Sequence, residues 1–409
     1  MKIKSFIPYK SETLNVNAIL QEVMGKHTIP PFDQRLIDIL NEFSLSILFD
    51  KHSRLYPELI VLANFFKKTN IEKIKKEFFL VPTNLRVARG LVFHIAPSNV
   101  DSVSIYSSLL SLLCGNINLI RISQPKSNQF LYVLDKLSVI LNNADNFLAN
   151  RFFIINYDHD DDITAQISQL CHLRVVWGGD ETVKKIRSIP LQPTASEICF
   201  PDRFSLSMIK AESLLRLDMN GLEELCLNFY NDSIWFSQQA CSSPKLIAWI
   251  GNEDICKEAR LQFWNVFNNI IKNKTFDNSP SMAIDRFVTA CVVACDDAYK
   301  ETSSLGFPTR LLLKNNSLYN LKKFHNGNGL FYEQNFYSIL DFFNSLSARE
   351  QTLSIFGFDE NEVEKNIVYL PMRAIDRVTK IGKALDFNYI WDGYNLIHSF
   401  TRQILFKIS

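Results

Sequence analysis

Residues 90–123 decide the fold, and they read GLVFHIAPSNVDSVSIYSSLLSLLCGNINLIRIS. A short apolar run from Gly90 to Ala96 leads through a turn into a helical pattern over about Ser102 to Cys114, and a second apolar run covers Asn118 to Ser123. Short apolar runs bounded by turn residues are typical of buried strands, and strands that alternate with helices form parallel sheets. This stretch therefore predicts a βαβ unit.

The same alternation extends along much of the chain. Helical patterns over about 127–142 and from the acidic cluster at 160–162 separate apolar runs at 152–156 and 173–179. Residues 10–85 carry helix-like apolar spacing. In the second half, strands are predicted at 245–250, 310–313 and 366–370, and a helix at 252–272. The pattern as a whole predicts an α/β protein.

The length of 409 residues predicts more than one domain, because single cores stop growing near roughly 250 to 300 residues. We expect two α/β lobes with a cleft between them. The predicted division is a helical N-terminal region over 1–85 packed on the first lobe, a first lobe over 86–215, a second over 216–390, and a C-terminal tail over 391–409. The turns that follow the strands define the functional edge of such a lobe.

Composition excludes several classes of protein. The formal charge of +1 creates no global field that would attract nucleic acid or an anionic membrane. No run approaches about 18 apolar residues, so no membrane span is expected, and the eight cysteines contain no CxxC pair, which indicates neither a disulfide framework nor a metal site. We expect a cytoplasmic protein with reduced thiols. The 32 phenylalanines fit a Phe-packed core, which we favour, or a wide apolar pocket.

Two turns after predicted strands carry candidate binding residues. Asn99 either caps the next helix, a position that Asn favours, or directs its amide into the cleft. The turn from Trp177 to Thr182 contains Gly178 and Gly179, which let the backbone approach a ligand, and a helix N-terminus that suits a phosphate. A plain tight turn explains the glycines equally well.

Arg121 and Ser123 close another predicted strand and lie on one face of it, two residues apart. An acid at position 123 would bind a ribose diol but would repel a 2′-phosphate by about 1 to 4 kcal/mol at roughly 4 Å. Serine together with arginine therefore leaves room for NADP.

The string Gln238-Gln-Ala-Cys241-Ser-Ser-Pro places a cysteine among small and polar residues ahead of a predicted strand. This context indicates a thiol in a turn, which is a candidate nucleophile. A structural role stays open, because cysteines outside disulfides are among the most buried residue types. The acidic segment 157–162 fits a solvated helix start better than a metal site, and His94 fits a core residue better than a base.

Taken together, these strings resemble the aldehyde dehydrogenase superfamily, and more closely its acyl-CoA reductase branch, the LuxC-type fatty acid reductases. The resemblance covers about residues 85–395, and its pieces occur in the expected order: HIAPSNV at 94–100, LLSLLCGN at 109–116, LIRIS at 119–123, VWGGDET at 176–182, QQACSSP at 238–244 and WDGYN at 391–395. It implies an aldehyde-dehydrogenase-like α/β fold, with a Rossmann-type NADP-binding domain over 86–215 and a catalytic-thiol domain over 216–390.

The resemblance also implies roles for single residues. Cys241 falls at the catalytic thiol, and Asn99 falls at the amide that supports the oxyanion. Gly178 and Gly179 match the turn over the pyrophosphate, and Glu333 matches the glutamate that holds the nicotinamide ribose. The implied cofactor-binding residues are thus Arg121, Ser123, Gly178, Gly179, Thr182 and Glu333, without a metal.

One departure from the superfamily is informative. Its Glu-Leu-Gly-Gly string, whose glutamate activates water to hydrolyse the acyl-enzyme, should fall near residues 197–205 and is absent, although Glu197 could partly substitute. The resemblance thus implies reduction of a fatty acyl thioester to the aldehyde by NADPH, through a cysteine acyl-enzyme. Its implied partners are a fatty acyl-CoA or acyl-protein donor, an acyl-protein synthetase and further copies of the chain. The alternatives are an NADP-dependent aldehyde dehydrogenase and a non-catalytic scaffold that binds acyl carriers or a partner.

Overall fold

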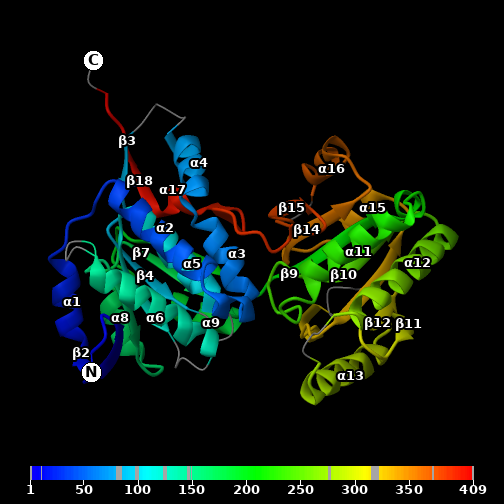
Figure 1. Cartoon of the computed structure of the whole chain (residues 1–409), viewed down its shortest axis with the longest axis horizontal. Helices are drawn as coiled ribbons and strands as arrows, with labels where there is room; N and C mark the ends of the chain where they lie inside the picture. The colour runs from blue at the N-terminus through cyan, green and yellow to red at the C-terminus, as the bar shows by residue number, and fades with distance from the viewer. Residues whose placement is uncertain are drawn as a thin grey trace. The chain divides into compact units, whose positions relative to one another are not determined.

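A computed structural model describes residues 2–10, 12–79, 85–96, 101–122, 127–144, 148, 150–274, 278–314, 322–370 and 373–407, apart from the side chain of Asp101. The chain forms two compact units (Figure 1). Unit 1 contains Met1–Asp202 and Phe387–Ser409, and unit 2 contains Arg203–Asp386. Each unit is an α/β structure built around its own sheet.

The sheet of unit 1 has the strand order β2-β1-β6-β5-β4-β7-β8. The pairs among β6, β5, β4, β7 and β8 are parallel, whereas β1 runs antiparallel to both β6 and β2. The strands are β1 (Lys2–Ile7), β2 (Leu14–Asn15), β4 (Leu91–Ile95), β5 (Ile117–Ile122), β6 (Phe152–Asn156), β7 (Leu173–Trp177) and β8 (Ser196–Phe200).

Alternate side chains of these strands enter two cores, one on each face of the sheet, as the two-residue period of a strand requires. Ile120 and Phe152 enter one core, and their neighbours Leu119 and Phe153 enter the other. The first core is covered by α2 (Gln34–Leu48), α3 (Pro57–Phe65), α4 (Lys68–Phe79), α5 (Asp101–Leu113) and α6 (Asn128–Asn143). The second is covered by α1 (Val16–Met24), α8 (Asp161–Ser168) and α9 (Asp180–Arg187).

The C-terminal segment completes unit 1. Helix α17 (Leu396–Phe400) contributes Leu396, Ile397 and Phe400 to the first core. Strand β18 (Thr401–Ile404) pairs antiparallel with β3 (Leu85–Ala88). The same segment also contains β16 (Ile390–Trp391) and β17 (Tyr394–Asn395). Residues at both ends of the chain are therefore needed to close one core.

The sheet of unit 2 has the order β11-β12-β13-β10-β9-β14-β15, and only β11 is antiparallel to its neighbour among the described pairs. The strands are β9 (Phe204–Lys210), β10 (Pro244–Ile250), β11 (Tyr299–Ser304), β12 (Thr309–Leu313), β13 (Leu330–Phe336), β14 (Glu350–Phe356) and β15 (Arg377–Lys380). One face packs on α10 (Ala211–Leu215), α11 (Met219–Ser233) and α12 (Glu253–Lys272), and the other on α13 (Pro280–Ala294), α15 (Ile339–Asn344) and α16 (Glu360–Ile367).

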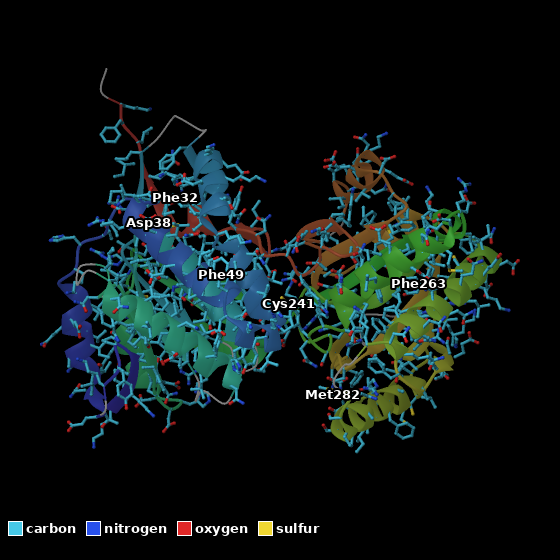
Figure 2. All side chains as sticks on the ribbon, viewed as in Figure 1. Phe32, Asp38, Phe49, Cys241, Phe263 and Met282 are labelled. Atoms are coloured by element: carbon cyan, nitrogen blue, oxygen red, sulfur yellow. The ribbon has the colours of Figure 1, made fainter. Side chains whose placement is uncertain are left out.

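The many phenylalanines serve the cores of both units. In unit 2, Phe263 of α12, which Figure 2 labels, lies in an aromatic cluster with Phe229, Trp264 and Phe267. In unit 1, Phe43, Phe66, Phe93, Phe152 and Phe153 are fully buried. The Phe-packed core is therefore confirmed for these residues.

Three sequence expectations need correction. The division of the chain falls after Asp202 and not near 215, because β9 pairs with β10 and β14 of unit 2. The segment 1–85 is not purely helical, since β1 joins the sheet of unit 1. Residues 366–370 form no strand: they are the end of α16 and the turn after it. Among the described residues, no helix combines the length and apolar character that a membrane span requires.

Candidate active site

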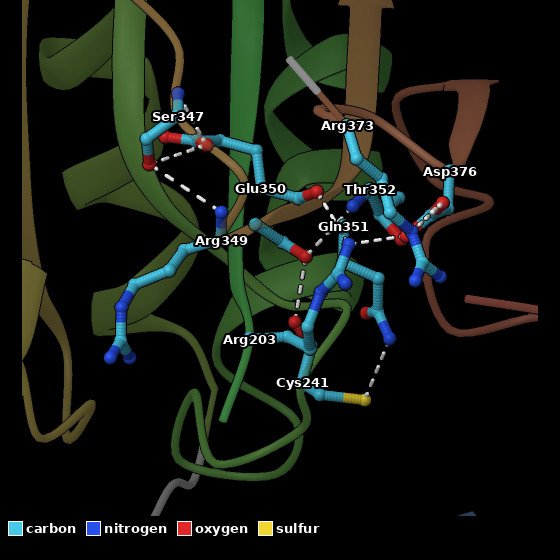
Figure 3. Close-up of polar contacts among 10 residues, drawn as sticks. Arg203, Cys241, Ser347, Arg349, Glu350, Gln351, Thr352, Arg373 and Asp376 are labelled. Carbon is cyan, nitrogen blue, oxygen red and sulfur yellow. Dashed lines mark hydrogen bonds and ion pairs between the residues drawn. The ribbon is translucent and has the colours of Figure 1, made fainter. Parts of the chain in front are cut away.

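Cys241 lies in the loop between α11 and β10, at the edge of the unit 2 sheet where the parallel strands begin. Its side chain is half-buried. The Ser205 hydroxyl donates to the Cys241 carbonyl oxygen at 2.6 Å, and the Gln351 amide nitrogen donates to Cys241 Sγ at 3.6 Å (Figure 3). The thiol is thus partly accessible and is contacted from β14, whereas β9 holds the backbone of the same residue.

The loop ahead of Cys241 has an unusual backbone. Ser237 and Gln238 adopt φ values of +50° and +62°, which cost energy for residues with a Cβ. The turn at 326–329 holds this shape: the Asn328 N–H donates to the Ser237 carbonyl at 2.7 Å, and the Gly329 N–H donates to Gln238 Oε1 at 3.1 Å. The Gln239 amide donates to the Asn326 carbonyl at 2.8 Å. These bonds fix the direction from which the chain enters Cys241.

A buried arginine supports that turn from behind. Arg286 of α13 is 4% exposed and donates to the Asn328 carbonyl at 2.8 Å and to Asn278 Oδ1 at 2.7 Å. Its guanidinium also lies 5.0 Å from the centre of the Phe307 ring. Charged donors make stronger hydrogen bonds than neutral ones, so Arg286 restrains the support of the Cys241 loop.

Two buried ion pairs flank the start of β14 beside the thiol. Lys322 pairs with Glu350, whose other oxygen accepts from the N–H and hydroxyl of Ser347 at 2.8 and 2.9 Å. Arg203 pairs with Asp376 and also donates to the Glu350 carbonyl at 2.7 Å (Figure 3). Each buried charge has a partner, which limits the cost of its desolvation.

The candidate residues of unit 1 lie at the edge of its sheet where the parallel strands end. The chain runs from β4 outward to β5 and β6 and then returns to place β7 on the other side of β4. Such a switch point is where open α/β sheets bind nucleotides. Arg121 of β5, half-buried against the Tyr157 ring at 5.4 Å, and the turn after β7 both lie at this edge. Asn99 and Ser123 lie outside the described residues.

The Gly178–Gly179 turn leads from β7 into α9, as predicted, and Thr182 is exposed in the first turn of that helix. A Cβ on Gly178 would lie 3.0 Å from Thr182 Cγ2, so a side chain there would crowd the threonine. The indole N–H of Trp177, at the end of β7, is buried without a partner among the described residues. The strand order fits a nucleotide at the switch point, whereas the buried indole N–H is enclosed by protein atoms.

The charge at the same turn is less favourable for a pyrophosphate. The Asp202 carboxylate accepts from the Asp180 N–H at 3.2 Å, and Asp180 and Glu181 are the first residues of α9. The carboxylate of Asp202 therefore occupies a position at the helix N-terminus that an anion would otherwise fill.

Comparison with known proteins identifies a family that part of the chain resembles. Residues 83–269 match the family model of acyl-CoA reductase (LuxC). This part of the chain is therefore similar to the LuxC family. A long-chain acyl-protein thioester reductase from Aliivibrio fischeri is 28% identical over 167 residues, and this match spans 40% of the chain but only 33% of that relative's length.

Solved structures show that the chain has the aldehyde dehydrogenase fold, as predicted. Aldehyde dehydrogenase 21 from Physcomitrella patens superimposes with a TM-score of 0.67 at 10% identity, covering 95% of this chain and 88% of that one. A betaine aldehyde dehydrogenase from Staphylococcus aureus, solved in complex with NAD⁺, superimposes with a TM-score of 0.65 at 12% identity, covering 98% and 93%.

Glu333 lies in the middle of β13 and is fully buried. Its Oε2 accepts from the indole N–H groups of Trp249 and Trp264 at 3.0 and 2.9 Å, and its Oε1 has no partner among the described residues. Burial raises the pKa of this carboxyl above its usual range. The carboxyl is enclosed by side chains of unit 2, and its assignment to the nicotinamide ribose stays a prediction.

Other polar residues considered as candidates in the sequence have hydrogen-bond or ion-pair partners in the structure. Glu197 of β8 forms ion pairs with Arg174 at 2.5 Å and Arg187 at 3.3 Å. His94 is fully buried between Asn118 and Ser107, and burial lowers its pKa to about 4, which confirms a core histidine. Asp160 caps α8 through the Ile163 N–H at 3.0 Å, which confirms the helix start.

The accessibility of the eight cysteines agrees only in part with the sequence prediction. The seven cysteines other than Cys241 stand in apolar helix or strand contexts of the sequence, which predicts protected thiols. Cys114, Cys171, Cys226 and Cys256 are indeed buried, and Cys199 is half-buried. Cys291 and Cys295 are exposed, because they lie on the outer side and at the end of α13. That prediction is wrong for these two, and thiol experiments must remove them.

Sequence reasoning missed Gln351, Arg203 and Ser205, although all three lie around Cys241. Gln351 is 110 positions from Cys241 in sequence. It sits in a string without a recognisable motif, so no local signal marks it.

Proposed function

We propose that the chain reduces a fatty acyl thioester to the aldehyde with NADPH, through an acyl-enzyme on Cys241. The observation that carries the proposal is a half-buried thiol, braced at an unusual loop and contacted by an amide donor, in a chain whose residues 83–269 match acyl-CoA reductases. The Aliivibrio fischeri relative, an acyl-protein thioester reductase, supports an acyl thioester as the substrate.

The chemistry begins at the sulfur. The Cys241 thiolate attacks the thioester carbonyl, a new C–S bond forms, and the donor leaves as a thiolate. The enzyme thioester then accepts a hydride at its carbonyl carbon, and the resulting thiohemiacetal collapses to aldehyde and regenerates the Cys241 thiolate. One NADPH and one proton are consumed, and one donor thiol is released.

The developing oxyanion needs a hydrogen-bond donor in both steps. We assign this role to the Asn99 amide and the backbone N–H of Cys241, and each donor of this kind typically contributes about 2.7 to 4 kcal/mol. Asn99→Ala should therefore lower the rates of acylation and reduction by about a hundredfold or more, with nucleotide binding nearly unchanged. A loss of stability with normal turnover would instead identify Asn99 as a helix cap.

NADPH supplies the hydride when bound, and the residues of unit 1 at the switch point would hold it. Gly178 and Gly179 would face the pyrophosphate, and Arg121 with Ser123 would face the adenosine ribose and its 2′-phosphate. Thr182 and Glu333 complete the proposed cofactor-binding set. The proposal also includes a cytoplasmic location, a homo-oligomer, and a synthetase that supplies acyl groups from acyl-CoA or an acyl-protein.

The test is the site of acylation. The Cys291→Ser/Cys295→Ser variant, which lacks the two exposed thiols, is mixed with a long-chain acyl-CoA without NADPH. Intact mass should show one acyl group, and peptide mapping should place it on Cys241. Addition of NADPH should then release the fatty aldehyde.

Two further outcomes decide against the proposal. If Cys241→Ala in the same background still makes aldehyde, the nucleophile is another residue. If NADPH leaves the adduct intact while water releases the fatty acid, the chain hydrolyses its acyl-enzyme and is not a reductase.

A further inference from the structure

The side chain of Gln351 is aimed at the proposed nucleophile. Gln351 is the second residue of β14, it is 4% exposed, and its Nε2 lies 3.6 Å from Cys241 Sγ (Figure 3). We propose that Gln351 donates a hydrogen bond to the Cys241 thiolate and so increases the fraction of reactive sulfur near neutral pH. Its consequence for acyl transfer rests on the proposed function, but its effect on the thiol does not.

An irregularity in the sheet gives Gln351 this direction. Between β9 and β14 the register advances two residues on β9, from Phe204 to Leu206, and three on β14, from Glu350 to Leu353. Ser205 thus opposes two residues, Gln351 and Thr352. An extra residue of this kind bends its strand and redirects side chains, and such irregularities are frequent beside active sites.

A chain of hydrogen bonds ties the redirected strand to the cysteine. The Thr352 N–H donates to Ser205 Oγ at 3.2 Å, and the Ser205 hydroxyl donates to the Cys241 carbonyl at 2.6 Å. The residue after Gln351 is therefore linked through one side chain to the backbone of Cys241. This link joins the start of β14 to the loop that carries Cys241.

The residue before Gln351 is fixed as well. The Glu350 carboxylate is fully buried between Lys322 and Ser347, and its carbonyl accepts from Arg203. Both sides of Gln351 are restrained, so its side chain loses little further freedom when it contacts the sulfur.

An amide at position 351 has two chemical consequences for the neighbouring sulfur. A neutral N–H donor stabilises a thiolate, whereas a carboxylate in the same place would repel it. An amide also has no proton affinity near neutral pH, so Gln351 cannot act as a general base toward water. Both properties favour transfer of the acyl group over its hydrolysis.

The experiment measures thiol reactivity without substrate or nucleotide. In the Cys291→Ser/Cys295→Ser background, the rate of Cys241 alkylation by iodoacetamide is followed by peptide mass between pH 5 and 10. Gln351→Met keeps the length of the side chain and removes the donor. We expect the midpoint of its pH profile to move upward by about one unit, with alkylation roughly tenfold slower below the midpoint, because hydrogen bonds to charged groups contribute about that much.

The matched control is Gln334→Met. Gln334 is also buried, at 1% exposure, but its amide donates to the Lys314 carbonyl at the other end of the sheet. Its pH profile should match that of the parent. Gln351→Leu repeats the test with a different shape, in case the methionine variant does not fold.

The outcomes separate the two proposals. An unchanged midpoint in folded Gln351 variants overturns the inference, and a downward shift shows that the amide accepts from the protonated thiol instead. Because alkylation needs no acyl-CoA and no NADPH, an upward shift stands even if Cys241 forms no acyl-enzyme.

Discussion

The turn that supports the Cys241 loop leaves no room for a side chain at Gly327. Its φ is +78°, and a Cβ built there would lie 2.8 Å from Gln239 Nε2 and 3.0 Å from the carbonyl oxygens of Gln238 and Ser237. Left-handed backbone costs a residue with a Cβ about 1 to 2 kcal/mol, and overpacking typically costs about 1 to 3 kcal/mol. Gly327→Ala should therefore cost about 2 to 5 kcal/mol if the loop stays in place.

The loop can relieve this strain only by moving. Ser237 and Gln238 already have positive φ values, so a shift would change the approach of the chain to Cys241. A displacement of about 1 Å can lower a reaction rate by about a hundredfold. We therefore expect Gly327→Ala either to lower the free energy of unfolding of unit 2 by about 2 to 5 kcal/mol or to slow acylation of Cys241 by about tenfold to a hundredfold.

The assays are urea unfolding, followed by the fluorescence of buried Trp249 and Trp264 in unit 2, and the rate of adduct formation with acyl-CoA by intact mass. Gly306→Ala is the control, because a Cβ there meets only Ser304 Oγ, at 3.8 Å, and the backbone is not left-handed. If Gly327→Ala matches the Gly306→Ala variant in both stability and acylation rate, the turn does not position the cysteine loop.

Three further predictions concern charge. NADPH should be preferred over NADH, and Ser123→Glu should shift the preference toward NADH in steady-state kinetics; equal efficiency with both nucleotides in the parent chain would contradict the assignment. Asp202→Asn should tighten NADPH binding about fivefold at low salt, because it removes one negative charge beside the α9 N-terminus. The affinity is measured by fluorescence titration, and an unchanged affinity would place the pyrophosphate elsewhere. Burial raises the pKa of Asp232 to about 7. Its contribution to the free energy of unfolding is therefore fully present below about pH 4 and is lost as pH rises through 7, by up to about 4 kcal/mol. The difference in unfolding free energy between the parent and Asp232→Asn should change over that pH range, and a constant difference would refute the shift.

The parts of the fold that follow from local pattern are predictable from the sequence. The apolar runs of β4, β5, β6 and β7 are buried on both faces, and their boundaries match the expected strands within one or two residues. Strand β9 is harder to recognise, because Ser205 and Ser207 interrupt its apolar pattern yet are fully buried. The Ser207 hydroxyl is satisfied by Ser354 at 2.5 Å on a strand far along the chain. Such pairing cannot be inferred from neighbouring residues.

The candidate site is likewise only partly predictable from the sequence. Cys241 and the Gly178–Gly179 turn lie in the loops that their strings predict, because small residues and glycine mark turns. The surroundings of Cys241 could not be predicted, since Gln351 and Asn328 reach it only through the order of strands in the sheet. The error at 366–370 has a similar origin: its apolar residues suit a strand by propensity, but tertiary packing uses them to end a helix.

The return of residues 387–407 to unit 1 has a consequence for synthesis of the chain on the ribosome. Until this segment emerges, β3 has no β18 to pair with, and the Asn116 amide lacks the Phe400 carbonyl to which it donates at 2.9 Å. At about 5 to 20 residues per second, translation of residues 203–386 occupies on the order of ten to forty seconds. Unit 2 can therefore complete its own core before unit 1 does. During this time β3 of unit 1 has an unpaired edge, and chaperones protect surfaces of this kind.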